Sequence, residues 1–374
     1  MINEERLVRL FLDLCRINAP PRQERDSVAY TRKYLTDTVG LEVWEDDAAC
    51  RIGGNANNLV ARLPGNEPEA PAIFFSAHFD TVEPTAGLKI EERDGVFYSA
   101  SDTILGADDK AGMAPAIEAV HAIKESGEAH GDVYLLLTCA EEIGLLGAAA
   151  MDVETLGLDF GYVLDTGPPV GTYVTRTATH DRLDFKVVGR PAHAGKEPEK
   201  GVNAIEVAAA AIAQMKIGRI GPETVANVGT IQGGTATNVV PAECVVRCEA
   251  RSTSVDELDA QIDHMIQCFE AAAERFGATV EVEHDRHYRN YSIDPDHRVV
   301  RVGVEASRRL GMEPELRTTL GGSDANIFNA KGVPSIVLAT GMKEIHTHNE
   351  NVSRKDLVDT ARLALEIIRV AAGR

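Results

Sequence analysis

The stretch Ile73-Phe74-Phe75-Ser76-Ala77-His78-Phe79-Asp80-Thr81 joins a run of apolar residues to an imidazole and a carboxylate that stand two positions apart. The apolar run predicts a buried strand. Alternate residues of a strand point to the same side, so His78 and Asp80 can be near neighbours. A carboxylate beside a metal-binding imidazole fixes its tautomer and raises its basicity. Because such pairs also occur at ordinary strand ends, this pair indicates a metal site only together with other ligands.

The composition is that of a folded protein with more than one domain. The chain has 374 residues, 44% of them hydrophobic and 26% charged, and this length exceeds the needs of a single core. The net charge of −20, without a block of Lys or Arg, disfavours nucleic acid as a partner and favours cations or small ligands. The six cysteines contain no Cys-x-x-Cys pair, which argues against a disulfide framework and against a thiolate zinc site.

The sequence indicates neither a secreted protein nor a membrane protein. The N-terminal residues read directly into an amphipathic helix and lack the apolar core of a signal peptide. No stretch approaches the length of apolar sequence that a membrane span requires. We therefore expect a cytoplasmic protein that does not contact membranes.

Strand and helix patterns alternate on both sides of residues 73–81. The predicted strands are residues 58–63, 72–77, 133–138, 162–164 and 335–339, and the predicted helices include residues 110–124, 299–310 and 355–371. Ser353 is the expected N-cap of the last helix. This alternation predicts an α/β fold with a central, mostly parallel sheet that helices cover on both faces.

From about Thr179, the middle of the chain shows a different order of predicted strands and helices. Its predicted elements follow the order β-α-β-β-α-β, which is typical of a separate α+β domain. Capping patterns open its two helices at Asn203 and Ser254. We expect an inserted domain of residues 179–287, which interrupts a discontinuous main domain of residues 1–178 and 288–374.

Charged side chains follow the ends of several predicted strands and open one predicted helix. They are His78 and Asp80, Asp108-Asp109, Glu141-Glu142, Asp165 and His346. Taken alone, each has an ordinary explanation as a helix cap, a solvated helix start, a turn residue or an exposed loop histidine. However, ligands of open α/β sheets collect outside the carboxyl ends of the strands, where these residues should meet. Their shared location favours a functional site.

The residue types in this set indicate a pair of divalent metal ions. Converging carboxylates repel one another unless a cation lies between them. Two histidines and three carboxylates without a thiolate suit Zn²⁺ above all, with Mn²⁺ or Co²⁺ as alternatives. Asp108, central in chain order, is the best candidate for a bridging ligand. Since Glu141 and Glu142 are adjacent, one can bind metal while the other takes a proton from an activated water.

Seven segments follow the pattern of a known family in the same order along the chain. They are Ser76 to Thr81, Gly106 to Gly112, Glu141 to Gly144, Leu164-Asp165, Arg190 to Gly195 with Gly201 to Ala204, Gly233 to Pro241, and His346 to Glu350. On these residues the chain resembles the M20 metallopeptidases, and most closely their peptidase T-like, tripeptide-aminopeptidase branch. The resemblance spans the whole chain. It implies a dizinc catalytic domain with an inserted lid and dimerisation domain.

The resemblance also implies roles for the individual residues. The metal ligands would be His78, Asp108 (bridging), Glu142, Asp165 and His346. Asp80 would orient His78, and Glu141 would be the general base. His346 is preferred over His348 because the family's ligand lies four residues before a glutamate, here Glu350. The family usually carries a cis peptide bond after the bridging aspartate, which here would join Asp108 and Asp109.

Three further residues of the inserted domain match the family pattern. His193 matches a histidine that stabilises the tetrahedral oxyanion, often from the partner subunit. Asn238 matches an asparagine that contacts substrate. Arg251 matches an arginine that holds a substrate carboxylate, for which its planar guanidinium is suited. A surface ion pair is the ordinary alternative for Arg251, and Arg247 is close enough to compete for the role.

The function that the resemblance implies is hydrolysis of the N-terminal peptide bond of short peptides, tripeptides foremost, by a homodimer with two divalent metal ions. An aminoacylase, a deacetylase or a carboxypeptidase, acting on N-acyl amino acids or dipeptides, would need the same metal site and remains an alternative. An alternative of another class is a non-catalytic metal-binding or peptide-binding protein. An unligated glutamate base would have no use in such a protein, which favours an enzyme.

Overall fold

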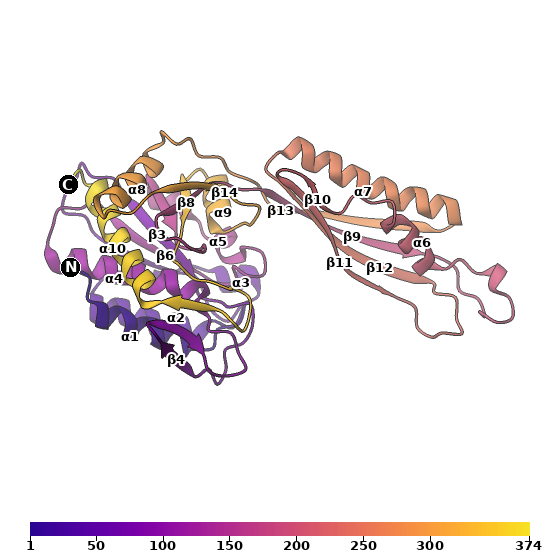
Figure 1. Cartoon of the computed structure of the whole chain (residues 1–374), viewed down its shortest axis with the longest axis horizontal. Coiled ribbons are helices and arrows are strands. Elements are labelled where there is room, and N and C mark those ends of the chain that lie inside the picture. Colours follow the sequence, from indigo (N-terminus) through magenta and orange to yellow (C-terminus); the bar gives the residue numbers. More distant parts are fainter. The chain divides into compact units, whose positions relative to one another are not determined.

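The computed structural model describes residues 1–374 and divides them into two compact units. The main unit comprises residues 1–175, 291–318 and 323–374, and the inserted unit comprises residues 176–290 and 319–322. The inserted unit carries the colours of the middle of the chain, and both chain termini belong to the main unit (Figure 1). The chain therefore leaves the main unit twice, once for a long segment and once for a short one.

An eight-stranded sheet forms the centre of the main unit, with the strand order β1-β2-β6-β3-β7-β15-β8-β14. The four central strands β6, β3, β7 and β15 run parallel, while β1 is antiparallel to β2, β2 to β6, and β8 to β15. The bounds are β1 Glu42–Glu45, β2 Leu59–Leu63, β3 Ile73–His78, β6 Val133–Thr138, β7 Phe160–Val163, β8 Thr172–Arg176, β14 Glu315–Thr318 and β15 Ser335–Leu338. All residues of the central strands are buried, as the apolar runs predict.

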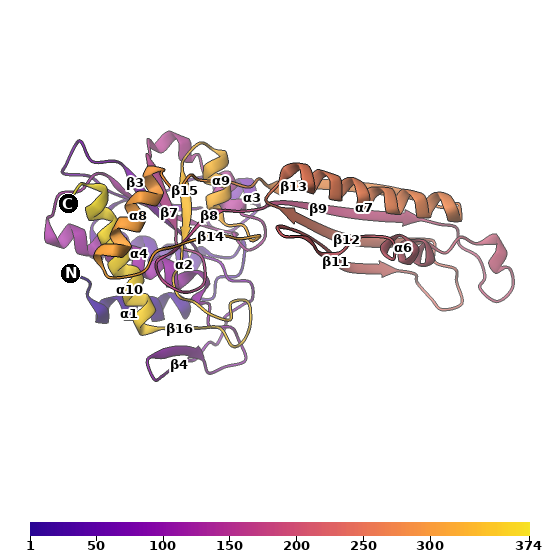
Figure 2. The ribbon, with the colours of Figure 1, turned by 45° about the horizontal axis from the view of Figure 1, so that its top comes forward.

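Two groups of helices pack on this sheet. The helices α1 (Glu4–Cys15), α4 (Ala107–Ser126), α8 (Arg298–Arg309) and α10 (Arg354–Ala371) pack together, and α8 contacts β7 and β15. The helices α3 (Ala48–Ile52), α5 (Leu146–Ala150) and α9 (Asp324–Ala330) form the other group, in which α9 also contacts β7 and β15. Figure 2 shows α8 and α9 beside β7 and β15. The mixed α/β architecture with a mostly parallel centre agrees with the prediction.

Local sequence explains where the long helices begin. The side chain of Asn3 accepts the backbone N–H of Arg6 at the start of α1, and Ser353 accepts that of Asp356 at the start of α10. Ser353 is therefore the N-cap that its position predicts. The stripe of Leu7, Leu10 and Leu14 on α1 is buried.

The remaining elements of the main unit are short. They are α2 Arg25–Lys33, a π-helical turn Tyr34–Val39, a 3₁₀ turn Val153–Leu156, and a three-stranded sheet of β4 Ile90–Arg93, β5 Val96–Ser99 and β16 Asn351–Ser353. In that sheet β16 pairs with β5, so the segment that follows His346 is tied to residues of the first third of the chain. None of the helices, in either unit, has the length and apolar character that crossing a bilayer would require.

The inserted unit is an antiparallel sheet with two helices on one face. Its strand order is β10-β11-β12-β9-β13. The bounds are β9 Thr179–Val188, α6 Ala204–Ile212, β10 Gly218–Gly221, β11 Thr224–Gly233, β12 Glu243–Ser252, α7 Val255–Phe276 and β13 Thr279–Tyr288, with a 3₁₀ turn at Pro198–Lys200. Alternate residues of β9 face the helices, where Phe185 stacks on Phe269 with ring centroids 4.0 Å apart. The predicted order β-α-β-β-α-β is present, with β10 as an additional short strand.

Candidate metal centre

The carboxyl ends of three neighbouring parallel strands carry the candidate site. His78 is the last residue of β3, the turn after β6 carries Glu141 and Glu142, and Asp165 follows β7. Because β6, β3 and β7 are adjacent and parallel, their carboxyl ends meet at one edge of the sheet. The start of α4 adds Asp108, whose peptide bond to Asp109 is cis.

Three groups of side chains have their ligand atoms close enough to hold a metal ion. The groups are His78 with Asp108 and Asp165, His78 with Glu141 and Glu142, and Asp108 with Glu142 and His346, and within each group the ligand atoms lie within 4.8 Å of one another. These groups contain all five residues that the sequence suggests as ligands, together with Glu141. All lie in the main unit.

Asp108 lies between the two histidines. Its Oδ1 is 3.2 Å from His78 Nε2, and its Oδ2 is 3.2 Å from His346 Nε2. His346 Nε2 is in turn 3.3 Å from Glu142 Oε1. A carboxylate that directs each of its oxygens to a different imidazole could hold one ion together with each of them.

The electrostatics of this cluster favour bound cations. Burial raises the pKa of Asp165 well above its ordinary value, and the charges of Asp108 and Glu141 raise it further. Burial raises the pKa of Glu141 as well, with Asp324 and Glu142 adding to the effect. The hydrogen bond to Asp108 and the negative charge of the nearby Glu142 raise the pKa of His346 to about 10. Without cations, the cluster must therefore take up protons to balance its negative charge.

One buried atom further supports a fit to metal ions. Glu142 Oε1 is buried and makes no hydrogen bond, although His346 Nε2 is nearby. A buried carboxylate oxygen without a hydrogen-bond donor is costly unless a cation compensates it. The donor set of imidazole and carboxylate groups suits zinc, manganese or cobalt. The residues present therefore fit a pair of divalent ions.

Asp80 contacts both His78 and the glutamate pair. Its backbone carbonyl lies 3.0 Å from His78 Nδ1, and its carboxylate Oδ1 lies 3.4 Å from the same nitrogen. The two carboxylate oxygens also accept the backbone N–H groups of Glu141 and Glu142, each at 3.0 Å. Asp80 thus stands behind His78, where the sequence suggests it, and in addition it holds the turn of the glutamates.

Glu350 is a residue that the sequence reasoning used only as a landmark. It is fully buried, and its two carboxylate oxygens accept the backbone N–H groups of Gly106 at 2.6 Å and Asp108 at 2.8 Å. The only sequence signal for this role is its position four residues after His346. His348 belongs to none of the three ligand groups and instead lies 3.4 Å from both Glu83 and Asp102.

The three predicted residues of the inserted unit lie on its loops and on β12. His193 forms an isolated β-bridge with Val239, and the carbonyl of Asn238 accepts the backbone N–H of Ala194, so these two loops lie side by side. Arg251 on β12 donates to Glu249 Oε2 at 3.1 Å and, through Nη1, to Tyr288 and the carbonyl of Leu320 at longer distances. Arg247, the competing arginine, pairs with Asp184 at 3.2 Å.

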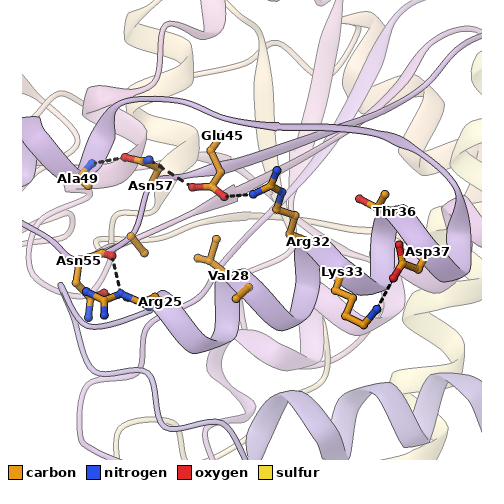
Figure 3. A pocket seen from close by; sticks show the side chains of 12 residues that line it. Arg25, Val28, Arg32, Lys33, Thr36, Asp37, Glu45, Ala49, Asn55 and Asn57 are labelled. Carbon is orange, nitrogen blue, oxygen red and sulfur yellow. Dashed lines mark hydrogen bonds and ion pairs between the residues drawn. The ribbon is translucent and has the colours of Figure 1, made fainter.

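A hollow of about 460 Å³ elsewhere in the main unit does not belong to this site. It lies between α2 and residues 45–57, and both of its carboxylates pair with cations: Glu45 with Arg32 at 3.3 Å, and Asp37 with Lys33 (Figure 3). None of its residues belongs to the ligand groups described above. Because the charges compensate one another, the hollow has no converging set of free ligands.

Comparison with known proteins agrees with this site. The model of peptidase family M20/M25/M40 matches residues 74–370. The uncharacterized protein YqjE of Bacillus subtilis (strain 168) is 38% identical over 372 residues, which cover 100% of each chain. Two solved structures cover 100% of this chain and are fully covered by it. One is aminopeptidase PepT from Bacillus cereus ATCC 10987 (39% identity, TM-score 0.91), and the other is a tripeptidase from Staphylococcus aureus subsp. aureus Mu50 (38% identity, TM-score 0.95). The chain therefore belongs to peptidase family M20/M25/M40 and is a hydrolase that acts on peptide bonds.

Proposed function

We propose that the protein is an aminopeptidase that uses two divalent metal ions to remove the N-terminal residue of short peptides, tripeptides foremost. The observation that carries this proposal is the position of Asp108, with one carboxylate oxygen beside His78 and the other beside His346. The printed names of the two solved structures at 38% and 39% identity, an aminopeptidase and a tripeptidase, support the substrate class.

The main unit would hold the metal ions and the base. The proposed ligands are His78, Asp108, Glu142, Asp165 and His346, and zinc is the first candidate metal, with manganese or cobalt as alternatives. Two such ions would supply a water of lowered pKa and a Lewis acid for the scissile carbonyl. Glu141 would take a proton from the attacking water and deliver it to the amine nitrogen as the C–N bond breaks. The products are a free amino acid and a shortened peptide.

The inserted unit would bind the substrate. We assign to His193 the stabilisation of the negative charge that develops on the carbonyl oxygen. Asn238 would contact the peptide, and Arg251 would pair with its carboxylate terminus. We also propose that the protein forms a homodimer through this unit, which sedimentation measurements on the purified protein would test.

The decisive experiment compares peptides with free and blocked N-termini before and after chelation. We expect hydrolysis of tripeptides with a free N-terminus, its loss on treatment with a chelator and its recovery on addition of zinc. Cleavage restricted to acylated substrates would indicate an aminoacylase or deacetylase instead, and release of the C-terminal residue would indicate a carboxypeptidase. Metal binding without hydrolysis of any peptide would indicate a binding protein.

A further inference from the structure

Side chains from other parts of the chain bind four successive backbone N–H groups in the turn that carries the glutamate pair. The donors are the N–H groups of residues 139 to 142, and their acceptors in order are Asn58 Oδ1, Glu24 Oε1, Asp80 Oδ1 and Asp80 Oδ2, at distances of 2.9, 2.9, 3.0 and 3.0 Å. No strand or helix supplies these bonds. The direction of the Glu141 side chain therefore depends on three distant side chains.

Of the three acceptors, Asp80 also contacts His78, whereas Glu24 contacts none of the candidate ligands through its side chain. It precedes α2 in the N-cap position, yet its side chain makes no capping hydrogen bond to that helix. Its Oε1 instead accepts the N–H of Ala140, which lies 116 positions away in the sequence, and that of Arg22 at 2.8 Å. Glu24 has no exposed surface. The carboxyl group thus faces the glutamate turn rather than its own helix.

The residue that Glu24 binds has an unusual backbone conformation. Ala140 has a φ of 54°, in the left-handed region that side-chain-bearing residues rarely adopt. Such a conformation persists only where the surroundings impose it. Removal of the Glu24 carboxyl would leave the N–H of Ala140 buried without an acceptor, which favours a different turn. Glu141 is the next residue, so a different turn would move the proposed base.

The burial of the Glu24 carboxyl group costs folding stability. Glu24 and Asp80 accept the adjacent N–H groups of Ala140 and Glu141, so burial and the charge of Asp80 both raise the pKa of Glu24. Glu24 Oε2 is buried and has no hydrogen-bond partner. A buried carboxyl with one free oxygen costs stability, which argues that the geometry it imposes has a use.

We propose that Glu24 is a positioning residue that holds the turn of residues 139–142 and thereby directs the Glu141 side chain in the reaction. The inference rests on the proposed function only in the role of Glu141. With Glu24, the site would include the segment before α2, none of whose residues belongs to the three ligand groups. The same segment also contacts the turn that follows β3, because the carbonyl of Ala19 accepts the N–H of Thr81 at 3.1 Å.

The test compares Glu24→Ala with Glu24→Gln, which keeps an acceptor oxygen in place. In Glu24→Ala we expect kcat per folded molecule to fall about 10-fold to 100-fold with KM essentially unchanged, and Glu24→Gln to recover most of it. Amide hydrogen exchange in a peptide that spans residues 139–145 should be faster in Glu24→Ala than in the wild type and in Glu24→Gln. This measurement needs neither substrate nor metal.

Glu118→Ala is the matched control. Glu118 is another buried carboxylate of the main unit, and it accepts the N–H of Asn3 at 2.7 Å and pairs with Arg6. Its removal should lower stability without lowering kcat. Wild-type kcat in Glu24→Ala, an equal loss in Glu24→Gln, or an equal loss in Glu118→Ala would each overturn the inference. If the wild type does not cleave tripeptides while the exchange result holds, the proposed function fails and the effect on the turn stands.

Discussion

The carboxylate of Glu350 accepts the backbone N–H of Asp108 at 2.8 Å, although 242 positions separate the two residues in the sequence. This bond fastens the loop of His346 to the start of α4. The contact of His346 with Asp108 therefore does not rest on the two side chains alone. Glu350, which belongs to none of the three ligand groups, thus holds together two parts of the site that come from the first third and the end of the chain.

Glu350→Ala should weaken metal binding and destabilise the main unit. The variant leaves the N–H groups of Gly106 and Asp108 buried and unpaired, which we expect to cost about 2–4 kcal/mol of unfolding free energy. Metal affinity should fall about 10-fold to 100-fold, as for other residues that orient ligands. Competition with a chromophoric chelator measures the affinity, and denaturant unfolding measures the stability. His348→Ala, an exposed histidine of the same loop, should leave both unchanged.

Substitutions of the adjacent Glu141 and Glu142 should have different effects on metal content and turnover. Glu141→Gln should keep its metal and lose about 10²-fold to 10⁴-fold in kcat, because a general base is removed. Glu142→Ala should instead bind less than two metal ions per chain. Elemental analysis of the purified variants, combined with tripeptide turnover, distinguishes them. The reverse pattern would mean that the roles of the two residues are exchanged.

His193→Ala should remain folded, keep its metal content and lose about 10²-fold to 10³-fold in kcat, which is the usual cost of removing one oxyanion donor. His264→Ala on α7, another histidine of the inserted unit, serves as the control and should turn over at the wild-type rate. Steady-state kinetics on one tripeptide is sufficient. Turnover of the His193 variant at the wild-type rate would exclude the role.

The inserted unit should lose stability at acid pH through Asp181. This buried carboxylate accepts bonds from Arg286 Nε and Nη2, both at 2.9 Å, and lies 2.7 Å from His284 Nε2. Burial would raise the pKa of Asp181, but the bonds from Arg286 and His284 outweigh it and lower the pKa below the ordinary value.

A carboxyl group whose pKa is lower in the folded state stabilises that state above its unfolded pKa of about 3.9, and this stabilisation is lost as the pH falls through the folded value. We therefore expect Asp181→Asn to unfold at a lower temperature than the wild type at pH 7. The difference should narrow as the pH falls from about 4, where the unfolded chain takes up the proton, through the lower pKa of Asp181 in the folded state. Scanning calorimetry at several pH values measures it, and a difference independent of pH would contradict the assignment.

The sequence predicts those parts of the fold whose pattern is local. β3 and β6 are continuous apolar runs, and their observed bounds differ from the predicted ones by at most one residue. The positions of the candidate ligands could be predicted because each follows a strand or opens a helix, and parallel strands bring such positions together. The choice of Glu142 over Glu141 and of His346 over His348 came from the family resemblance. The strands β8 and β10 were not predicted, since Thr172–Arg176 and Gly218–Gly221 contain polar residues or glycine and lack the continuous apolar run that marks β7 and β15.

The residues that hold the site in place were harder to predict than those that form it. Glu24 and Glu350 act by accepting backbone N–H groups from residues more than a hundred positions away. Any residue type can supply a backbone N–H group, so no spacing or motif records such a bond. Asp80 shows the same limit, because its position two residues from His78 indicates a role beside the imidazole but does not indicate its bonds to Glu141 and Glu142.

The place of β15 between β7 and β8 has a consequence for synthesis on the ribosome. β7 and β8 emerge from the ribosome long before residues 335–338. Until β15 is made, the edges of β7 and β8 that it will pair with have no partner strand. All strands of the inserted unit have emerged by then, and it can fold first. Chains that stop before residue 335 should therefore be prone to aggregate. His346 follows β15, so the full set of ligands becomes available only after the strand that closes the sheet has been made.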